Sequence, residues 1–384
     1  MTAQRGSVSL DAAGSTAMVR EVVRKEVAPH AASFDAAAAI PRPFLDNVVA
    51  PRGWWGALTS HEYGGEGMTT RELGYLHEEV GSGCSGLRSL LTVHTMVAFL
   101  IERVGSAAQR QAWLPSMASG ATLATFCLSE DASSSDFSGV RCRAELKEGT
   151  WTISGTKTWV TGGLIADVHL VFARHGDGIA AFLVPSGARG LTVTAVRDLL
   201  GTRASTVARL VLDEVRLPRS AVIGERSLVP GFLPALALDL GRFSVAAGCA
   251  GIVSACLRDC VSYTSSRVVD GEPLSAKQLT KQKLADMVTA LSASRALRDV
   301  AAAHRDDGTP GFSRATWIAK YYSARQAAET ASMAVQLHGS VGCAASHATS
   351  RYYRDAKVME IIEGSTEVQQ LTIGDFTIGG AHQL

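Results

Sequence analysis

A single carboxylate near the carboxy-terminal end of the chain has the surroundings of a general base. Glu363 follows the apolar pair Ile361-Ile362 and precedes the small pair Gly364-Ser365, at the start of a predicted helix. Apolar neighbours exclude water from a carboxylate and raise its pKa toward the range useful for proton abstraction. A structural role is the alternative, because glutamate is favoured near a helix N-terminus and serine is a common N-cap. The segment alone favours the structural role.

The elements that must position this carboxylate change type twice along the chain. Apolar residues recur at helical spacing up to about residue 120, with Gly or Pro between the segments. From residue 122 to about 224 the pattern becomes short runs of Val, Leu, Ile and Thr that predict strands, with a hairpin turn at Lys147–Gly149.

Long helices return after Pro230, and they are strongly apolar and rich in alanine. They are predicted at 240–267, 277–305 and 313–338, and a shorter terminal helix would complete a four-helix bundle. The order predicts three domains: helical over 1–120, β over 121–226, and a helical bundle over 227–384.

Composition excludes several classes of protein. The chain has 384 residues, of which 46% are hydrophobic, and a formal net charge of +1. This charge gives no electrostatic footprint for nucleic acid. We expect no membrane span, because no apolar run approaches the length needed to cross a bilayer, and no signal-peptide core at the start. A cytoplasmic location is the resulting expectation.

Common catalytic and metal motifs are missing from the sequence. The seven cysteines form no CxxC pair and match no histidine spacing, so we expect no zinc, and Cys249, Cys256 and Cys260 are expected in the core. No GxGxxG follows a strand, no lysine-bearing phosphate loop occurs, and GxSxG is absent. These absences argue against a nicotinamide-binding domain and a common α/β hydrolase.

Six segments resemble, in order and spacing, those of the flavin-dependent acyl-CoA dehydrogenases. They are FCLSEDASSSD, TISGTKTWVTGG, GTRASTVARLVLDEVRLPRSAVIGE, SSRVVDGEPLSAKQLTKQKLADM, AKYYSARQAAETASMAVQLHGSVG and YYRDAKVMEIIEGSTEVQ. The resemblance covers nearly the whole chain. It implies an α+β fold with an N-terminal helical domain, a middle β-barrel or sandwich domain and a C-terminal four-helix bundle.

The resemblance implies that Glu363 removes the α-proton of an acyl thioester while the β-hydrogen leaves as hydride to flavin N5. The family's other position for this base falls near Gly241, which has no side chain to act. The enolate oxygen would be stabilised by the N–H of Glu363 and by the flavin itself. Asp239 and Arg242, which could simply form an i,i+3 ion pair, and Gly364 are implied to line the substrate site.

The cofactor implied by the resemblance is FAD. The residues implied to hold its ring, phosphates and adenosine are Phe126, Leu128, Ser129, Ser135, Trp159, Thr161, Arg267, Gln278, Gln336, Gly339, Ser340, Ser365 and Glu367. Ser135 could instead touch the thioester. Taken singly, exposed Arg or Gln and a strand Trp are usually structural. Arg267 and Gln278 match residues that reach FAD from a neighbouring subunit, so a homodimer or a dimer of dimers is expected.

The sequence departs from the family pattern at Asp131–Ser134, at Asp270 and at Ser340. We expect weaker FAD binding and a specialised substrate from these changes. The sequence is similar to a branch that makes methoxymalonyl-type polyketide extender units in bacterial secondary metabolism. The resemblance therefore implies a short acyl group on acyl carrier protein or CoA, with the electron acceptor open. The alternatives are an oxidase or monooxygenase on this fold and a flavin-poor subunit that docks carrier protein.

Overall fold

The computed structural model describes residues 12–131, 139–224 and 232–379, and its first part is helical. Two of its helices begin with a capping box, which Thr69 and Ser106 each form with the residue three positions later. Short 3₁₀ and π turns join the helices. The α-helices are α1 (Ala12–Val22), α2 (Ala31–Ala37), α3 (Arg42–Phe44), α4 (Thr70–Gly83), α5 (Ser85–Val104) and α6 (Ala107–Ala118).

The middle part is an eight-stranded sheet in the order β6-β7-β3-β2-β4-β5-β8, with β1 paired to β4. Strands β2 and β4 share one register pair, so the sheet has two halves joined at a narrow seam. The predicted hairpin turn lies between β2 and β3: Glu148 and Gly149 both have positive φ, as a type I′ turn requires. The strands are β1 (Ala124–Cys127), β2 (Arg143–Lys147), β3 (Thr150–Val160), β4 (Val168–His175), β5 (Gly178–Pro185), β6 (Leu191–Ala195), β7 (Ala208–Pro218) and β8 (Val222–Ile223).

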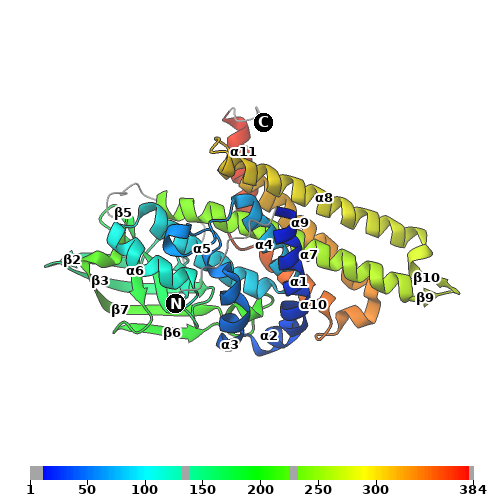
Figure 1. Ribbon diagram of the computed structural model, residues 1–384, viewed down its shortest axis with the longest axis horizontal. Helices are drawn as coiled ribbons and strands as arrows, with labels where there is room; N and C mark the ends of the chain where they lie inside the picture. The colour runs from blue at the N-terminus through cyan, green and yellow to red at the C-terminus, as the bar shows by residue number, and fades with distance from the viewer. Residues whose placement is uncertain (1–11, 132–138, 225–231, 380–384) are drawn as a thin grey trace, which may run out of the picture.

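The last part is a helical bundle that projects away from the sheet (Figure 1). Two short helices follow the three long ones, and α10, not the terminal α11, packs against both α7 and α9. The fourth place of the predicted bundle is therefore taken by α10. The elements are α7 (Phe232–Ser266), the hairpin β9 (Val268–Val269) and β10 (Glu272–Pro273), α8 (Gln278–Asp306), α9 (Phe312–His338), α10 (Ala348–Met359) and α11 (Thr366–Ile378).

Helix α7 corrects one expectation from the sequence. Among the described residues it is long and apolar enough to cross a membrane by length and composition, with an 18-residue window of mean hydropathy 1.6. However, 89% of that window is buried inside the protein. Packing thus accounts for the apolar character of α7, whose cysteines Cys249, Cys256 and Cys260 are fully buried as predicted.

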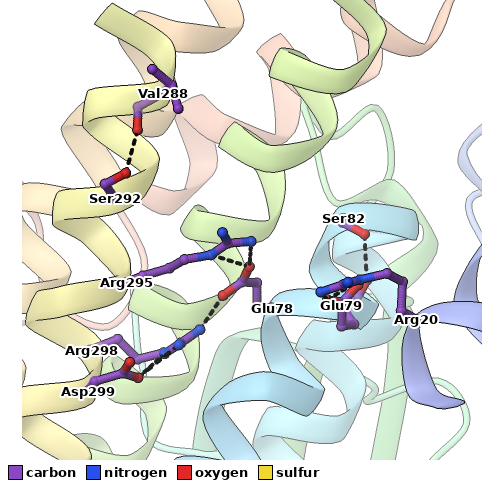
Figure 2. Close-up of polar contacts among 9 residues, drawn as sticks. All are labelled: Arg20, Glu78, Glu79, Ser82, Val288, Ser292, Arg295, Arg298 and Asp299. Carbon is purple, nitrogen blue, oxygen red and sulfur yellow. Dashed lines mark hydrogen bonds and ion pairs between the residues drawn. The ribbon is translucent and has the colours of Figure 1, made fainter. Parts of the chain in front are cut away.

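Helix α4 joins the N-terminal helices to the bundle. It packs against α7, α8, α1 and α5, and lies at the centre of Figure 1. Glu78 of α4 is buried and accepts hydrogen bonds from Arg295 and Arg298 of α8, while Glu79 pairs with Arg20 of α1 at 2.8 Å (Figure 2). Removing one partner of a buried ion pair strongly destabilises the folded protein, because the other charge is left unpaired. This network therefore fixes α4 against α8.

Candidate functional site

Glu363 lies in the turn between α10 and α11. The helix begins later than the sequence suggested, at Thr366, with Ser365 as its N-cap accepting a hydrogen bond from the N–H of Val368. Glu363 has φ of 57° and Gly364 has φ of 95°, both in the left-handed region. A residue other than glycine in this region carries strain, which persists only where the surroundings enforce it.

Three side chains from other elements hold the carbonyl groups of this turn. Arg242 of α7 donates Nε–H to the carbonyl oxygen of Glu363 at 3.2 Å, and Gln369 donates Nε2–H to the same oxygen at 3.2 Å. Lys320 of α9 donates Nζ–H to the carbonyl oxygen of Gly364 at 2.6 Å. These contacts fix the backbone that presents the Glu363 carboxylate. Sequence reasoning missed Lys320 and Gln369; a lone lysine in an alanine-rich helix was the available signal.

The carboxylate of Glu363 occupies the space that a side chain at residue 241 would take. A Cβ built on Gly241 would lie 2.4 Å from Oε2 and 2.6 Å from Cδ of Glu363. Oε2 is buried and has no hydrogen-bond partner among the described residues. The sequence predicted that Ile361 and Ile362 would exclude water from this carboxylate. This prediction was wrong for Ile361, which is 57% exposed. The face of α7 at Gly241 covers the carboxylate instead.

Burial raises the pKa of Glu363, as the sequence predicted. Three cations oppose this shift, in the order Arg242, Arg88 and Lys320. Lys320 is itself fully buried, and burial lowers its pKa to about 8. The carboxylate is therefore poised between desolvation, which favours its protonated form, and nearby positive charge, which favours its ionised form.

Arg242 forms the ion pair considered from the sequence and also lies beside Glu363. It forms the i,i+3 ion pair with Asp239 at 2.8 Å, and it lies against Glu363 through the backbone. Its guanidinium stacks 3.7 Å from the ring centre of Trp317. Burial raises the pKa of Asp239, and Arg242 acts in the opposite direction.

The residues implied to hold the flavin ring converge at the ends of β1 and β3. The N–H of Thr158 donates to the carbonyl oxygen of Ser129 at 2.9 Å, and the Thr125 hydroxyl donates to the carbonyl oxygen of Thr161. The buried ion pair of Lys157 with Glu130, at 2.7 Å, joins β3 to the segment that follows β1. The structure thereby brings together one set of predicted residues: Phe126, Leu128, Ser129, Trp159 and Thr161.

Trp159 has the properties of a platform for a flat ring. It is 62% exposed and has φ of 57°, at a bulge in the pairing of β3 with β7. A large exposed aromatic side chain on a left-handed backbone is unfavourable unless a function uses it. The side chains present here therefore fit an isoalloxazine ring.

The residues implied to hold the adenosine half lie at the other end of the bundle. Arg267 follows α7, Gln278 begins α8, and Gln336, Gly339 and Ser340 lie at the end of α9 and in the turn after it, all of them exposed. This is the tip that carries β9 and β10, remote from the sheet in Figure 1. One chain therefore does not bring its Trp159 and its Arg267 together.

The remaining predicted residues take three different places. Asp270, one of the departures, is in the two-residue turn of the β9–β10 hairpin with Gly271, and both have positive φ. Glu367 is exposed in the first turn of α11, where hydrogen bonds to its own backbone and to Ser365 lower its pKa. Ser135 lies outside the described residues.

A hollow of about 830 Å³ lies between α8, α9 and α10, and Glu363 is not among the residues that line it. Its lining is mixed and includes Glu329, Lys357 and Glu360. It touches none of the residues predicted for chemistry, so the chemistry is assigned to the Glu363 turn.

The sequence matches three domain descriptions of one family, in order along the chain. They are the N-terminal domain of acyl-CoA dehydrogenase over residues 15–121, the middle domain over 125–215 and the C-terminal domain over 234–377. The human mitochondrial short-chain specific acyl-CoA dehydrogenase is 33% identical over 364 residues, which covers 92% of this chain and 87% of that protein.

Solved structures agree with this match. FkbI, described as serving biosynthesis of the methoxymalonyl extender unit of the polyketide Fk520, is 36% identical with a TM-score of 0.87, covering 95% of this chain and 99% of that chain. Glutaryl-CoA dehydrogenase from Mycobacterium smegmatis is 32% identical with a TM-score of 0.92, covering 97% of this chain and 96% of that one. The fold predicted from the sequence is confirmed.

The raised pKa of Glu363 predicts a stability effect with a definite sign. Between its unfolded pKa and its raised folded pKa the native state binds more protons, so native stability falls as pH rises through this window. Glu363→Gln removes the titration. We therefore expect the free energy of unfolding of the variant, relative to the unsubstituted protein, to increase as pH rises above about 4.3, the ordinary pKa of glutamate, in urea titrations made between about pH 4 and pH 8.

Glu367→Gln is the matched control. The pKa of the Glu367 carboxylate is shifted in the opposite direction to that of Glu363. The free energy of unfolding of Glu367→Gln, relative to the unsubstituted protein, should therefore not increase as pH rises. A stability difference for Glu363→Gln that is constant across this pH range would show that the carboxylate is not desolvated in the native state.

Proposed function

Since the chain belongs to the acyl-CoA dehydrogenase family, whose members are FAD-dependent oxidoreductases, we propose that it dehydrogenates a short acyl thioester with Glu363 as the base. One observation supports this most strongly. The Glu363 carboxylate is buried against Gly241, with Oε2 unpartnered and with the turn that carries it held by Arg242, Gln369 and Lys320. A carboxylate held in this way is pre-organised to take a proton.

Glu363 contributes a second group to the reaction. Within the described residues its backbone N–H donates to no other group. The thioester carbonyl oxygen can accept this hydrogen bond, which strengthens as enolate charge develops while the α-proton passes to the carboxylate. Arg242 and Lys320 keep this N–H oriented through the carbonyl groups of the same turn.

FAD, when bound, supplies the acceptor for the hydride that leaves the β-carbon. Trp159, Phe126, Leu128, Ser129 and Thr161 would hold its ring system at the ends of β1 and β3. The exposed residues at the far tip of the bundle would hold the adenosine half of the cofactor of a neighbouring subunit: Arg267, Gln278, Gln336, Gly339 and Ser340. The protein is then at least a homodimer with shared sites.

Similarity to FkbI supports a place in the biosynthesis of polyketide extender units of the methoxymalonyl type. The acyl group would be carried by acyl carrier protein or CoA in the bacterial cytoplasm. The names of the similar proteins point to different acyl groups, so the acyl group must be inferred from the residues around Glu363.

Anaerobic mixing of the FAD-loaded protein with acyl thioesters tests this function. The correct thioester should bleach the flavin absorbance. Glu363→Gln should retain FAD but lose bleaching by about 1,000-fold or more, since removal of a general base typically slows proton transfer by 10² to 10⁴. Bleaching at the unsubstituted rate in this variant would eliminate Glu363 as the base. Stoichiometric peroxide in air would instead indicate an oxidase.

Gly241→Ala tests the packing that positions the base. The new Cβ would lie 2.4 Å from Oε2 of Glu363, so the carboxylate must move. We expect bleaching to slow by roughly 100-fold, as displacement of a reacting group by about 1 Å can do, with FAD content unchanged. Gly374→Ala in α11 meets no atom within 4 Å and should bleach at the unsubstituted rate. Equal rates for the two variants would contradict the assignment.

Co-expression of Glu363→Gln with Arg267→Ala tests the shared site. If Arg267 completes the site of its partner, each mixed dimer contains one site with both native residues. About a quarter of sites should then recover bleaching under random assortment, although each variant alone is inactive. If Arg267 serves its own chain, no site recovers.

A further inference from the structure

The helix that carries the base is tied to the β domain by one buried carboxylate. Asp355 lies in α10, shortly before Glu363 in the chain, and is 3% exposed. Its Oδ1 accepts a hydrogen bond of 2.6 Å from the backbone N–H of Thr202, in the loop 196–207 between β6 and β7. Burial raises the pKa of Asp355 to about 6, while this hydrogen bond and the charge of Arg351 act against the shift. The carboxylate is therefore ionised at neutral pH, and a hydrogen bond to an ionised acceptor is a strong one.

The loop approaches α10 more closely than a side chain would allow. A Cβ built on Gly201 would lie 2.3 Å from the carbonyl oxygen of Arg354 and 2.8 Å from the backbone nitrogen of Asp355. Only glycine therefore fits at this position. Arg354 Nη1–H donates to the carbonyl oxygen of Leu200 at 3.1 Å, and the same guanidinium pairs with Asp35 of α2. The loop is thus held against the helix at three consecutive residues.

The other end of the loop holds the turn that follows β3. The N–H of Gly162 donates to the carbonyl oxygen of Ser205 at 2.8 Å. The N–H of Leu164 donates to the carbonyl oxygen of Thr206 at 3.4 Å. Gly162 directly follows Thr161, one of the residues implied to hold the flavin ring. One short loop therefore contacts both the helix before the base and the turn beside the ring site.

The segment between these two contacts is a single strained turn. The hydroxyl of Ser205 donates to the carbonyl oxygen of Thr202 at 2.7 Å, which closes the turn. Thr202 and Thr206 both have φ of 49°, in the left-handed region, which β-branched residues rarely adopt. Such a conformation persists only where the surroundings enforce it. The contacts with α10 and with the turn after β3 are the ones that enforce it here.

The proposed reaction needs the base and the flavin at a fixed separation. Glu363 belongs to the helical bundle, whereas the residues implied to hold the ring belong to the β domain. Bond breaking at the α-carbon and at the β-carbon each requires reacting atoms about 3 to 3.5 Å apart. A displacement of one domain relative to the other therefore slows hydride transfer even when the base itself is intact.

We propose that Asp355 is a positioning residue, which sets the separation of Glu363 from the flavin ring through Thr202 and the loop 196–207. It acts through the backbone and not on the reacting atoms. This rests on the proposed function, because the roles of Glu363 and of the end of β3 are assigned there. A merely structural role would change stability without changing the balance between proton transfer and hydride transfer.

Hydrogen–deuterium exchange of the FAD-loaded protein tests the connection without turnover. Asp355→Ala removes the acceptor of the Thr202 N–H. Deuterium uptake should rise in peptides that cover 199–206 and also in those that cover 159–165, because the loop no longer holds the turn after β3. A rise that stops at the loop and does not reach 159–165 would overturn the proposal.

Two further variants are the controls. Asp355→Asn keeps Oδ1 as an acceptor and should take up deuterium as the unsubstituted protein does. Asp306 also accepts a hydrogen bond from the backbone of another element, the N–H of Thr70 at 2.7 Å. Asp306→Ala should therefore raise uptake at the start of α4 and leave 159–165 unchanged. Equal uptake over 159–165 in Asp306→Ala and Asp355→Ala would show general destabilisation and contradict the proposal.

Two rates measured with butanoyl-CoA in D₂O without oxygen test the consequence for the reaction. Exchange of the α-hydrogen with solvent needs the base, and mass spectrometry of the thioester follows it. Bleaching needs the base and also the flavin at its proper distance. Asp355→Ala should slow bleaching by about 100-fold, as a displacement of about 1 Å can do, and slow α-exchange much less. Asp355→Asn should restore bleaching, whereas an equal fall of both rates in Asp355→Ala would overturn the proposal.

The outcomes separate this proposal from the proposed function. Unsubstituted protein that neither bleaches nor exchanges the α-hydrogen would reject dehydrogenation of this thioester, and the deuterium uptake over 159–165 would still decide the role of Asp355. If Asp355→Ala does not retain FAD, Asp355→Glu takes its place. It moves the carboxylate by one methylene and should show the same pattern to a smaller extent.

Discussion

The site depends on close packing between two elements that are more than a hundred residues apart in the chain, the turn that carries Glu363 and helix α7. Gly241 lacks the side chain whose space the Glu363 carboxylate fills. Glycine within a helix is unfavourable by about 1 kcal/mol relative to alanine. The left-handed φ of Glu363 and its unpartnered Oε2 are unfavourable too. Burial of apolar side chains elsewhere, as along α7, must offset these unfavourable terms.

The cations near this carboxylate have more than one role. Burial raises the pKa of Glu363, while Arg242, Arg88 and Lys320 act against that shift. Arg242 and Lys320 also hold the backbone of the turn, whereas Arg88 donates to the hydroxyls of Thr92, Ser244 and Ser89.

Much of the fold was predictable because local patterns agreed with it. The alternation in β2 and β3 and the Glu148-Gly149 turn specify a hairpin without help from the rest of the chain. The cause of burial at Glu363 was not predictable from Ile361, and neither were Lys320 and Gln369. Their contacts depend on how distant helices pack, and no local spacing encodes this. Family resemblance, not residue pattern, pointed to Trp159 and Arg267.

The most direct test is a crystal structure of the FAD-loaded protein with an unreactive thioester analogue bound. The account predicts a Glu363 carboxylate oxygen about 3 to 3.5 Å from the α-carbon, still packed over Gly241, with the thioester oxygen on the N–H of Glu363. A Glu363 side chain turned to solvent, with another residue next to the α-carbon, would contradict it.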